Sequence, residues 1–322
     1  MSKVCKICGN VEQNKIVTGV EMMFQTREQF DYLECSGCGC LQILQSPSDI
    51  SRYYPKDYYS FEGSQMAIPV TSGLTYFLKS KVMSHKNIRP NMIGMLLSAK
   101  YKNPFEWLPK YKLNFNSRIL DVGSGAGHTL IEMYGRGFKN LTGIDPYIAA
   151  PITYNDSVRI KKTTLNEVRE EYDFVMLHHS FEHMDKPLSV LKEIKRVLAS
   201  GSYALIRIPV GNCYAYHVYA ENWVQFDAPR HLFLHTTKSM RLLSEQAGLE
   251  LTEVKFDSGP FQFWASEMYK KKIPLAEAIR SYKQYFTDQE LEAFRVQSEE
   301  LNETGQGDMA CFYLYKPYES KA

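Results

Sequence analysis

Apolar and polar positions follow two different periods from residue 118 onward. Apolar runs of strand length occur at "RILDVG" (118–123), "LTGIDP" (141–146), "VRIKKT" (158–163), "YDFVMLHH" (172–179), "YALIRIPV" (203–210), "LELTEVKF" (249–256) and "MACFYLYKP" (309–317). Between them, apolar residues three and four positions apart predict helices at 128–138, 187–201 and 236–248. This alternation of strand and helix predicts an α/β fold with a largely parallel sheet.

Two of these helices also carry signals at their ends. In the segment 187–201, Leu188, Leu191, Ile194 and Leu198 form an apolar stripe, and Gly201 is placed to cap the helix at its C-terminus. The helix at 236–248 is expected to begin after Thr236 or Thr237, since threonine is a favoured N-cap.

The first 46 residues follow another pattern, which cysteines dominate. Two C-x2-C pairs stand 26 residues apart, and each is followed by glycine, in "CKICGN" and "CSGCGC". A doubled pair predicts a structural zinc ribbon with short strands at "DYLEC" (31–35) and "CLQIL" (40–44). The expected ligands are Cys5, Cys8, Cys35 and Cys38. A redox pair or buried thiols are the alternatives, and Cys40 is either a substitute ligand or a small buried residue.

Residues 47–112 form a third region, which contains "RYYPKDYYSF" (52–61) and predicted helices at 74–87 and 92–102. Nine Lys or Arg residues stand against one acid, Glu106, between Lys79 and Arg118, although the whole chain carries a net charge of only +2. Two interpretations remain open: the solvated face of amphipathic helices, or a basic wall that faces a phosphorylated substrate. The small total charge argues against a dedicated nucleic-acid binder.

Composition adds an expectation about the compartment. The start of the chain, "MSKVCKICGN", has no apolar core of the kind a signal peptide needs, and no apolar run approaches the ~18 residues of a membrane helix. We therefore expect a cytoplasmic protein without a membrane span, in which thiols stay reduced.

The glycine turn after the first α/β strand predicts a nucleotide site. Gly123, Gly125 and Gly127 have the spacing G-x-G-x-G, which fits neither a phosphate loop nor the dinucleotide fingerprint, since His128 stands where the latter has its third glycine. Asp121 precedes the glycines and would repel a pyrophosphate but attract a cationic amino group. S-adenosylmethionine carries such a group together with a sulfonium, so we expect it as the cofactor.

A second acid supports this expectation. Asp145 ends the next strand, where a carboxylate can accept hydrogen bonds from both ribose hydroxyls. A tight turn with two internally satisfied acids is the alternative. The full set of expected cofactor contacts is Asp121, Gly123, Ser124, Gly125, Gly127, Asp145, Pro146 and His178.

The stretches "LDVGSGAGHTL", "GIDP", "YDFVMLHHSFEHMDKP" and "VLASGSYALIRIP" resemble class I S-adenosylmethionine-dependent methyltransferases. They are most similar to the branch that includes the ubiquinone-pathway O-methyltransferases, and the resemblance covers about residues 113–256 and the last strand. It implies a seven-stranded Rossmann-like sheet of order 3-2-1-4-5-7-6, with strand seven antiparallel. It also implies that His178 and His179 lie near the sulfonium.

A ribbon in front of this domain resembles the sugar-nucleotide C-methyltransferases of deoxysugar pathways. Those enzymes tend to have tyrosine where Ser180 stands here, which favours a hydroxyl over a carbon as the methylated atom. The predicted organisation is a zinc ribbon (1–46), a basic helical segment on the substrate side (47–112) and a methyltransferase domain (113–322). Insertions are expected near 211–235 and 259–306, the second of them helical.

Candidate bases gather in "HHSFEHMD", at the carboxyl edge of the predicted sheet. Methyl transfer needs an oriented acceptor and the removal of one proton, for which a histidine is suited near neutral pH. His183, beside Glu182, is the expected general base, with His179 and His231 as the other candidates. The alternative is that the Glu-His pair orders the following loop.

The insertion near 211–235 offers candidate substrate contacts. Trp223 and Phe226 are expected to stack on a ring, and Arg230 to bind a diphosphate through a fork of hydrogen bonds. The other interpretation treats the aromatic residues as packing and Arg230 as a salt-bridge partner of Asp227.

These features together predict methyl transfer to a hydroxyl, or less readily a carbon, of a nucleotide-linked or otherwise phosphorylated sugar, as in sugar biosynthesis. Two alternatives are a zinc-ribbon RNA base methyltransferase and an adaptor that binds the cofactor without turnover. An adaptor has no need of a histidine-rich edge, which favours an enzyme.

Overall fold

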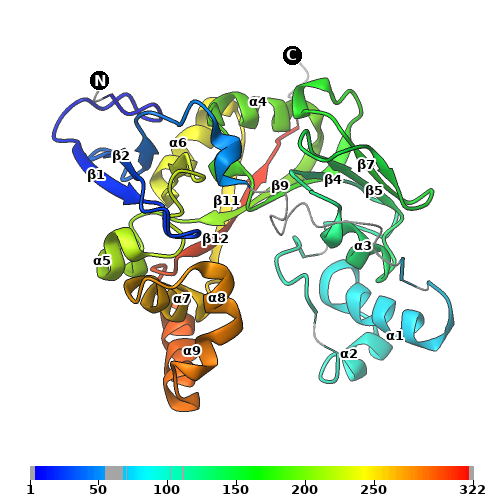
Figure 1. Cartoon of the computed structure of the whole chain (residues 1–322). Coiled ribbons are helices and arrows are strands. Elements are labelled where there is room, and N and C mark those ends of the chain that lie inside the picture. Colours follow the sequence, from blue (N-terminus) through cyan, green and yellow to red (C-terminus); the bar gives the residue numbers. More distant parts are fainter. Residues whose placement is uncertain (1–3, 55–67, 70, 102, 111, 319–322) are drawn as a thin grey trace.

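The computed structural model describes residues 4–54, 68–69, 71–101, 103–110 and 112–318, and its centre is an eight-stranded sheet (Figure 1). Its strands lie in the order β11-β12-β9-β8-β4-β5-β7-β6. Their bounds are β4 Arg118–Val122, β5 Asn140–Ile144, β6 Ile152–Thr153, β7 Val158–Lys161, β8 Tyr172–His178, β9 Leu198–Pro209, β11 Glu250–Phe256 and β12 Met309–Tyr315. The five strands from β9 to β7 run parallel, whereas β12 is antiparallel to both of its neighbours.

One strand of this sheet was not expected. β6 has two residues and pairs antiparallel with β7, so the sheet has eight strands where the sequence predicted seven. Numbered along the chain without β6, the remaining strands lie in the order 3-2-1-4-5-7-6. The connection of β4 to β5 through helix α3 brings the carboxyl ends of the parallel strands to one edge of the sheet.

Helices cover both faces of the sheet, and strand β8 shows how the sequence achieves this. Successive side chains on a strand point to opposite faces. Phe174 and Met176 share a core with α3 (His128–Tyr134), and Val175 and Leu177 share another with α4 (Pro187–Val197) and α6 (Thr237–Ala247). All four side chains are fully buried, so β8 lies at the centre of the domain.

Helix α4 is shorter than the sequence predicted. It ends at Val197, and Leu198 already begins β9, so Gly201 is not its C-cap. Gly201 lies instead within β9 beside the register shift between β8 and β9, with a φ of +78°. A Cβ atom there would lie 2.4 Å from the ring of Tyr318. The glycine therefore allows a close approach of strand and C-terminal segment.

The N-terminal region folds as a second, four-stranded sheet of order β1-β2-β3-β10. Its bounds are β1 Lys15–Val20, β2 Gln29–Glu34, β3 Leu41–Ile43 and β10 Phe233–Leu234. The predicted boundary at residue 46 is therefore incomplete, because β10 comes from the insertion after β9 and pairs antiparallel with β3. Thr236, directly before α6, donates a hydrogen bond from Oγ1 to the carbonyl oxygen of Cys38 at 2.6 Å. This four-stranded sheet with the cysteine loops beside it, called the ribbon below, is thus tied to the larger domain at two places.

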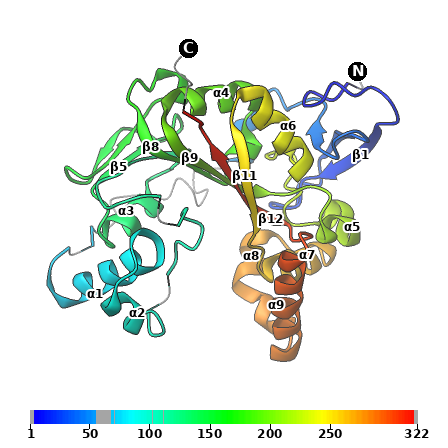
Figure 2. The same cartoon turned by 180° about the vertical axis from the view of Figure 1, so that it is seen from behind.

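The remaining α-helices form two projections, which lie apart from one another below the central sheet in both views (Figures 1 and 2). One consists of α5 Tyr214–Tyr219, α7 Phe261–Lys270, α8 Leu275–Ser281 and α9 Asp288–Glu303, which come from the two predicted insertions. The other lies beyond α3 and contains α1 Gly73–Met83, the π-helical turn η2 Ser84–Ile88 and α2 Met92–Leu97. The start of the 47–112 region folds as the short helix η1 Ile50–Tyr53, and the rest of "RYYPKDYYSF" lies outside the described residues. Among the described helices, none has the length and apolar character to cross a bilayer.

Candidate active site

The glycine turn connects β4 to α3 at the carboxyl edge of the sheet. Gly123, Gly125 and Gly127 have φ values of +78°, +51° and +86°, a region that strongly favours glycine. The backbone N–H groups of Gly123 and Ser124 donate to the carbonyl oxygen of Ile144 on β5, at 2.8 and 3.2 Å. A Cβ atom on Gly123 would lie 2.6 Å from that of Ser180. The turn therefore brings bare backbone to the edge where open α/β sheets bind ligands.

Two buried carboxylates flank this turn. Asp145 follows β5 and accepts hydrogen bonds from the N–H of Gly125 (3.0 Å, Oδ2) and of Tyr147 (2.8 Å, Oδ1). Asp121 lies within β4, where burial and then the charge of Asp145 raise its pKa to about 7. A cation placed beside Asp121 would restore its ionised form.

His178 ends β8 and packs against Trp107, with ring centroids 4.3 Å apart. Burial, followed by the charge of Arg207, lowers the pKa of His178 to about 3, so its imidazole is neutral. Trp107 belongs to the segment before β4 and was not among the predicted site residues. No motif surrounds it, and only the fold brings it to the end of β8.

Glu182 lies at the centre of the histidine-rich edge. Its side chain is fully buried, and neither carboxylate oxygen has a hydrogen-bond partner among the described residues. Oε1 lies 3.8 Å from Nδ1 of His179 and 3.9 Å from Nε2 of His231. Burial raises the pKa of Glu182 to about 8, so the carboxyl group is largely protonated at neutral pH.

The backbone fixes the tautomers of the two histidines beside Glu182. Nδ1 of His183 lies 2.8 Å from the carbonyl oxygen of Arg230, and Nδ1 of His231 lies 2.8 Å from that of Gln225. A carbonyl oxygen only accepts, so Nδ1 carries the proton in both rings and Nε2 keeps a lone pair. Burial lowers both pKa values, that of His231 to about 4.

Tyr54 adds a hydroxyl to this cluster, 3.2 Å from Nδ1 of His183. It lies in the N-terminal half of the chain, and the sequence gave no reason to place it near His183. Glu182, His183 and His231 also bring one ligand-type atom each to within 4.8 Å of one another. The cluster can therefore accept a proton from a bound hydroxyl, and its donor set is also of a kind that metal ions use.

A third histidine at this edge is oriented by an arginine. Arg207 on β9 donates from Nε to Asp257 at 2.7 Å, and its Nη1 lies 2.9 Å from Nε2 of His179. Since a guanidinium only donates, Nε2 of His179 accepts and Nδ1–H faces Glu182. Arg207 was not predicted as a site residue, although a single arginine within the apolar run "YALIRIPV" was a usable signal.

Comparison with known proteins identifies the domain that carries this edge. A family model described as a methyltransferase domain matches residues 97–254, about half of the chain. Residues 97–254 form a methyltransferase domain. Its α/β sheet is mostly parallel, as class I S-adenosylmethionine-dependent methyltransferases have it.

Individual relatives match only parts of the chain. The human EEF1A lysine methyltransferase 2 is 35% identical over 71 residues, which are 22% of this chain and 30% of that protein. The tRNA U34 carboxymethyltransferase of Haemophilus influenzae (strain PittEE) is 26% identical over 152 residues, 41% of this chain and 47% of that protein. The chain thus spans less than half the length of these relatives.

Among solved structures, a 1,6-didemethyltoxoflavin-N1-methyltransferase from Burkholderia thailandensis is similar with a TM-score of 0.37 and 12% identity. The match covers 63% of this chain and 72% of that one. The cyclopropane synthase MmaA2 from Mycobacterium tuberculosis is similar with a TM-score of 0.37 and 15% identity, over 62% and 78% of the two chains.

The two aromatic residues expected to hold a substrate ring are placed differently from the prediction. Trp223 is fully buried, and its indole N–H donates to Asp308 at 3.1 Å. Phe226 is also buried and packs edge-on against Tyr32 beneath the ribbon, with ring centroids 5.0 Å apart. Phe226 touches a pocket of about 460 Å³ between β1 and this insertion, but it is only 2% exposed. The burial of both rings agrees with the packing interpretation.

The side chain of Arg230 is likewise buried and forms its ion pairs inside the protein. Its side chain is 0% exposed, and its Nε lies 3.0 Å from both carboxylate oxygens of Asp227. Its Nη2 lies 2.5 Å from Oδ1 of Asp227 and 3.2 Å from Oε1 of Glu21. Two carboxylates thus compensate its charge, and a diphosphate has no access to it. The expected anion contact is therefore wrong, and the salt bridge to Asp227 is what the structure contains. The residue still contributes to the edge, because its carbonyl oxygen fixes His183.

The four predicted cysteines meet at the base of the ribbon. Sγ of Cys5 lies 3.7 Å from that of Cys38, and Sγ of Cys8 lies 3.5 Å from that of Cys35. Zn–S bonds of about 2.3 Å in a tetrahedron place the sulfurs about 3.8 Å apart, so the cluster is compatible with zinc. Cys40 is buried with its Sγ 3.9 Å from Nδ1 of His235, outside the cluster.

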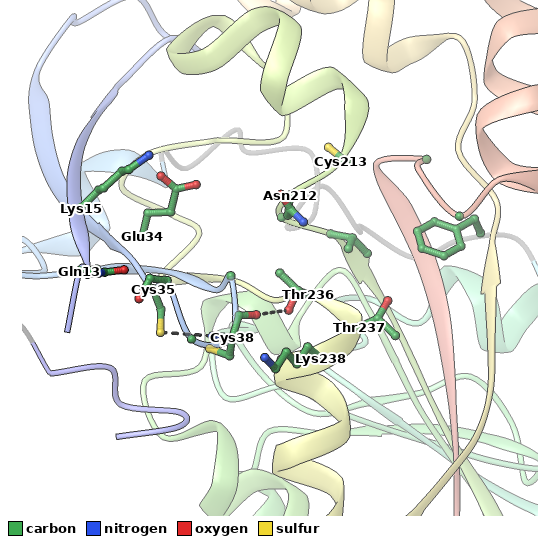
Figure 3. Close-up of a pocket in the computed structure, with 18 residues that line it drawn as sticks. Gln13, Lys15, Glu34, Cys35, Cys38, Asn212, Cys213, Thr236, Thr237 and Lys238 are labelled. Carbon is green, nitrogen blue, oxygen red and sulfur yellow. Dashed lines mark hydrogen bonds between the residues drawn. The ribbon is translucent and has the colours of Figure 1, made fainter. Parts of the chain in front are cut away.

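A pocket of about 600 Å³ separates the ribbon from the methyltransferase domain (Figure 3). Lys15 and Glu34 from the ribbon line one side, and Asn212, Thr236 and Lys238 from the domain line the other. None of the predicted catalytic residues lines this pocket. It is therefore distinct from the histidine-rich edge.

Proposed function

We propose that the protein is an enzyme that transfers the methyl group of S-adenosylmethionine to an acceptor at the histidine-rich edge. The observation that carries this proposal is the glycine turn with Asp121 and Asp145 on either side, within the methyltransferase domain. The cofactor supplies an electrophilic methyl group on its sulfonium. The side chains of the protein would have to bind the cofactor, orient the acceptor and remove its proton.

Asp121 and Asp145 are proposed to hold opposite ends of the cofactor. Asp121 would pair with the α-ammonium, which offsets the cost of ionising a buried carboxyl. Asp145 already accepts two backbone hydrogen bonds, but a carboxylate has about four acceptor positions, so two remain for the ribose hydroxyls. Ser124 in the glycine turn, Pro146 directly after Asp145 and His178 at the end of β8 are proposed as further contacts.

His183 is proposed as the general base. Its Nδ1–H is held by the carbonyl of Arg230, so Nε2 is the atom that would take the proton of the acceptor. Its lowered pKa keeps the ring neutral and able to accept at neutral pH. Glu182 and His231 lie close to it and are proposed to position it, while His179 and Arg207 would contact the acceptor.

The acceptor that we propose is a hydroxyl of a nucleotide-linked or otherwise phosphorylated sugar. The ribbon-plus-domain organisation supports this class through its resemblance to sugar-nucleotide methyltransferases. With Arg230 compensated internally, Arg207 is the proposed phosphate contact, because its side chain is 24% exposed at the edge beside His179. Carbon methylation of the same acceptor class is the less favoured version.

An RNA substrate is the second candidate. It is favoured by the similarity to tRNA U34 carboxymethyltransferase and by the excess of positive charge between Lys79 and Arg118.

We also propose that Cys5, Cys8, Cys35 and Cys38 bind a structural Zn²⁺, which their sulfur spacing and donor chemistry support.

The test supplies purified protein with a methyl-labelled donor and either a panel of nucleotide sugars or total RNA. Labelling of a sugar nucleotide that is lost in His183→Ala and retained in His217→Ala is the expected result; His217 is an exposed histidine on α5. Labelling of RNA alone would establish the second candidate. Donor binding without transfer to either class, or to a cell extract, would instead favour the cofactor-binding adaptor. Activity that a chelator abolishes without loss of ribbon zinc would replace the proposed base by a metal.

A further inference from the structure

Large apolar side chains are exposed together on α1 and α2. Six of them lie on these two helices: Leu74, Phe77, Met92, Ile93, Met95 and Leu96. Leu74, Met92 and Leu96 are 71%, 76% and 74% exposed, close to what an unfolded chain would show. Isolated apolar side chains are common on protein surfaces, but a group of this size marks an interaction site.

Helices α1 and α2 pack against each other, and we call their six exposed apolar residues the α1–α2 patch. Leu74 and Phe77 are three residues apart on α1, and Met92, Met95 and Leu96 have helical spacing on α2, so each set shares a face. Gly94 packs α2 onto α1, since a Cβ atom there would lie 2.3 Å from the carbonyl oxygen of Lys81. Helices α1 and α2 lie at the end of the projection beyond α3, apart from α7–α9 (Figures 1 and 2).

The rim of the α1–α2 patch is basic. Four exposed cations lie on α1, on η2 and in the segments that follow η2 and α2: Lys79, Lys86, Arg89 and Lys100. None of these four forms an ion pair within the described part of the chain. The sequence from residue 63 to 105 contains no aspartate or glutamate at all. Lys81 places its ammonium over the ring of Phe77, 5.1 Å from the ring centroid.

We propose that the α1–α2 patch docks on the surface of a lipid bilayer that contains anionic headgroups. Apolar side chains would enter the boundary between headgroups and acyl chains, and the surrounding lysines and arginine would pair with lipid phosphates. RNA accounts for the cations but leaves six exposed apolar side chains without a role. A second copy of the chain accounts for the apolar residues but would bring two basic rims together. The bilayer is the partner that satisfies both.

This inference is independent of the proposed methyl transfer, because no residue of the α1–α2 patch belongs to the proposed cofactor or catalytic set. The test uses the full-length protein and vesicles of phosphatidylcholine, with or without phosphatidylglycerol, in a flotation assay. We expect the protein to float with the anionic vesicles at low salt and to remain behind with neutral vesicles. High salt should release it, because counterions screen the basic rim.

Two variants separate the apolar contribution from the charge. The double variant Met92→Asp/Leu96→Asp should bind anionic vesicles at least about tenfold more weakly, and Lys79→Gln about fivefold more weakly. Val218→Asp, on the 54% exposed residue of α5 in the other projection, should float as the wild type does. Circular dichroism melts should coincide for all four proteins, since every substituted side chain is exposed.

Three results would overturn the proposal. The wild type fails to float with anionic vesicles, the double variant floats as well as the wild type, or the double variant converts a dimer into a monomer. Protection of the protein by RNA, with vesicle binding absent, would assign the rim to nucleic acid instead.

Discussion

If Asp121 pairs with the cofactor's ammonium group as proposed, the affinity for the cofactor should depend on pH. Its pKa of about 7 in the free protein means that it is partly protonated at neutral pH, whereas pairing with an ammonium would favour the ionised form. Cofactor binding would then release a proton. The affinity for S-adenosylhomocysteine, measured by calorimetry, should be constant above about pH 7 and fall as the pH drops below that value, by about tenfold per pH unit in the limit.

The Asp121→Asn variant should bind more weakly and lose this pH dependence. Asp156→Asn is a matched control, because Asp156 is fully exposed on the loop before β7. It should leave both the affinity and its pH profile unchanged. A wild-type affinity that stays flat across neutral pH would remove Asp121 from the cofactor site.

Glu182 makes a prediction about stability. Its pKa rises from 4.5 to about 8 on folding, so the native state holds a proton that the unfolded chain releases. The stabilisation from this proton is complete below about pH 4.5 and is lost as the pH rises toward 8. A glutamine at position 182 does not titrate, so the Glu182→Gln variant cannot lose this stabilisation as the pH rises. Urea unfolding should therefore show the variant gaining stability relative to the wild type from about pH 4.5 to 8, with a plateau above.

The control for this series is Glu245→Gln, on an exposed residue near the end of α6. Its unfolding free energy should run parallel to that of the wild type at every pH. A parallel curve for Glu182→Gln as well would mean that the buried carboxyl is compensated by a partner such as a bound cation.

Helix α6 connects the two sheets through its N-cap. The side chain of Thr236 accepts from the N–H of Ser239 and donates to the carbonyl of Cys38, so it caps the helix and holds the ribbon at once. Thr236→Ala should lower the unfolding free energy by about 1–2 kcal/mol for the cap and by more for the buried carbonyl left without a donor.

Thr287→Ala is the matched substitution, because Thr287 caps α9 through the same capping box but on an exposed surface. It should cost about 1 kcal/mol, the value of a cap alone. Equal losses in the two variants would mean that the contact with Cys38 contributes nothing. Thr236→Ser should retain most of the stability.

The elements that local pattern determines were predictable, and those that depend on distant partners were not. β4, β5 and β8 follow from apolar runs that end in acids or histidines, which also placed Asp121, Asp145 and Glu182 at one edge. The end of α4 was misplaced because Leu198 fits an apolar helix stripe and an apolar strand equally well.

Several residues in the interior of the candidate site could not be predicted from the sequence for a related reason. Trp107, Tyr54 and Arg207 reach it from three separate segments, and only tertiary packing brings them together. The salt bridge of Arg230 to Asp227 was one of the two interpretations that the sequence offered, because the two residues are three positions apart. Its second partner, Glu21, comes more than 200 residues earlier in the chain and could not be predicted from a local pattern.

At the scale of the whole molecule, a short stretch of chain joins the ribbon to the histidine-rich edge. β10 pairs with β3 and begins two residues after His231, so a change at the cysteine cluster has a short path to the proposed base. Cys35→Ser should lose about one zinc per chain by elemental analysis. We expect its rate of methyl transfer to fall, while its affinity for S-adenosylhomocysteine stays close to that of the wild type.

Cys213→Ser provides the comparison, because Cys213 is a buried thiol that caps α5 and lies outside the cluster. It should keep both zinc and activity. A Cys35→Ser protein without zinc but with full activity would show that the ribbon and the edge act separately.

The pairing of β10 with β3 also limits how such proteins can be recombined. The N-terminal residues alone cannot be transferred as a complete ribbon. Its last strand, β10, lies some 190 residues after β3, the strand with which it pairs. A chimera that carries a foreign ribbon would have to present a matching edge to Phe233 and Leu234, or leave those two residues without their ladder. Grafting experiments in this architecture should therefore exchange the ribbon and the 211–235 insertion as a pair.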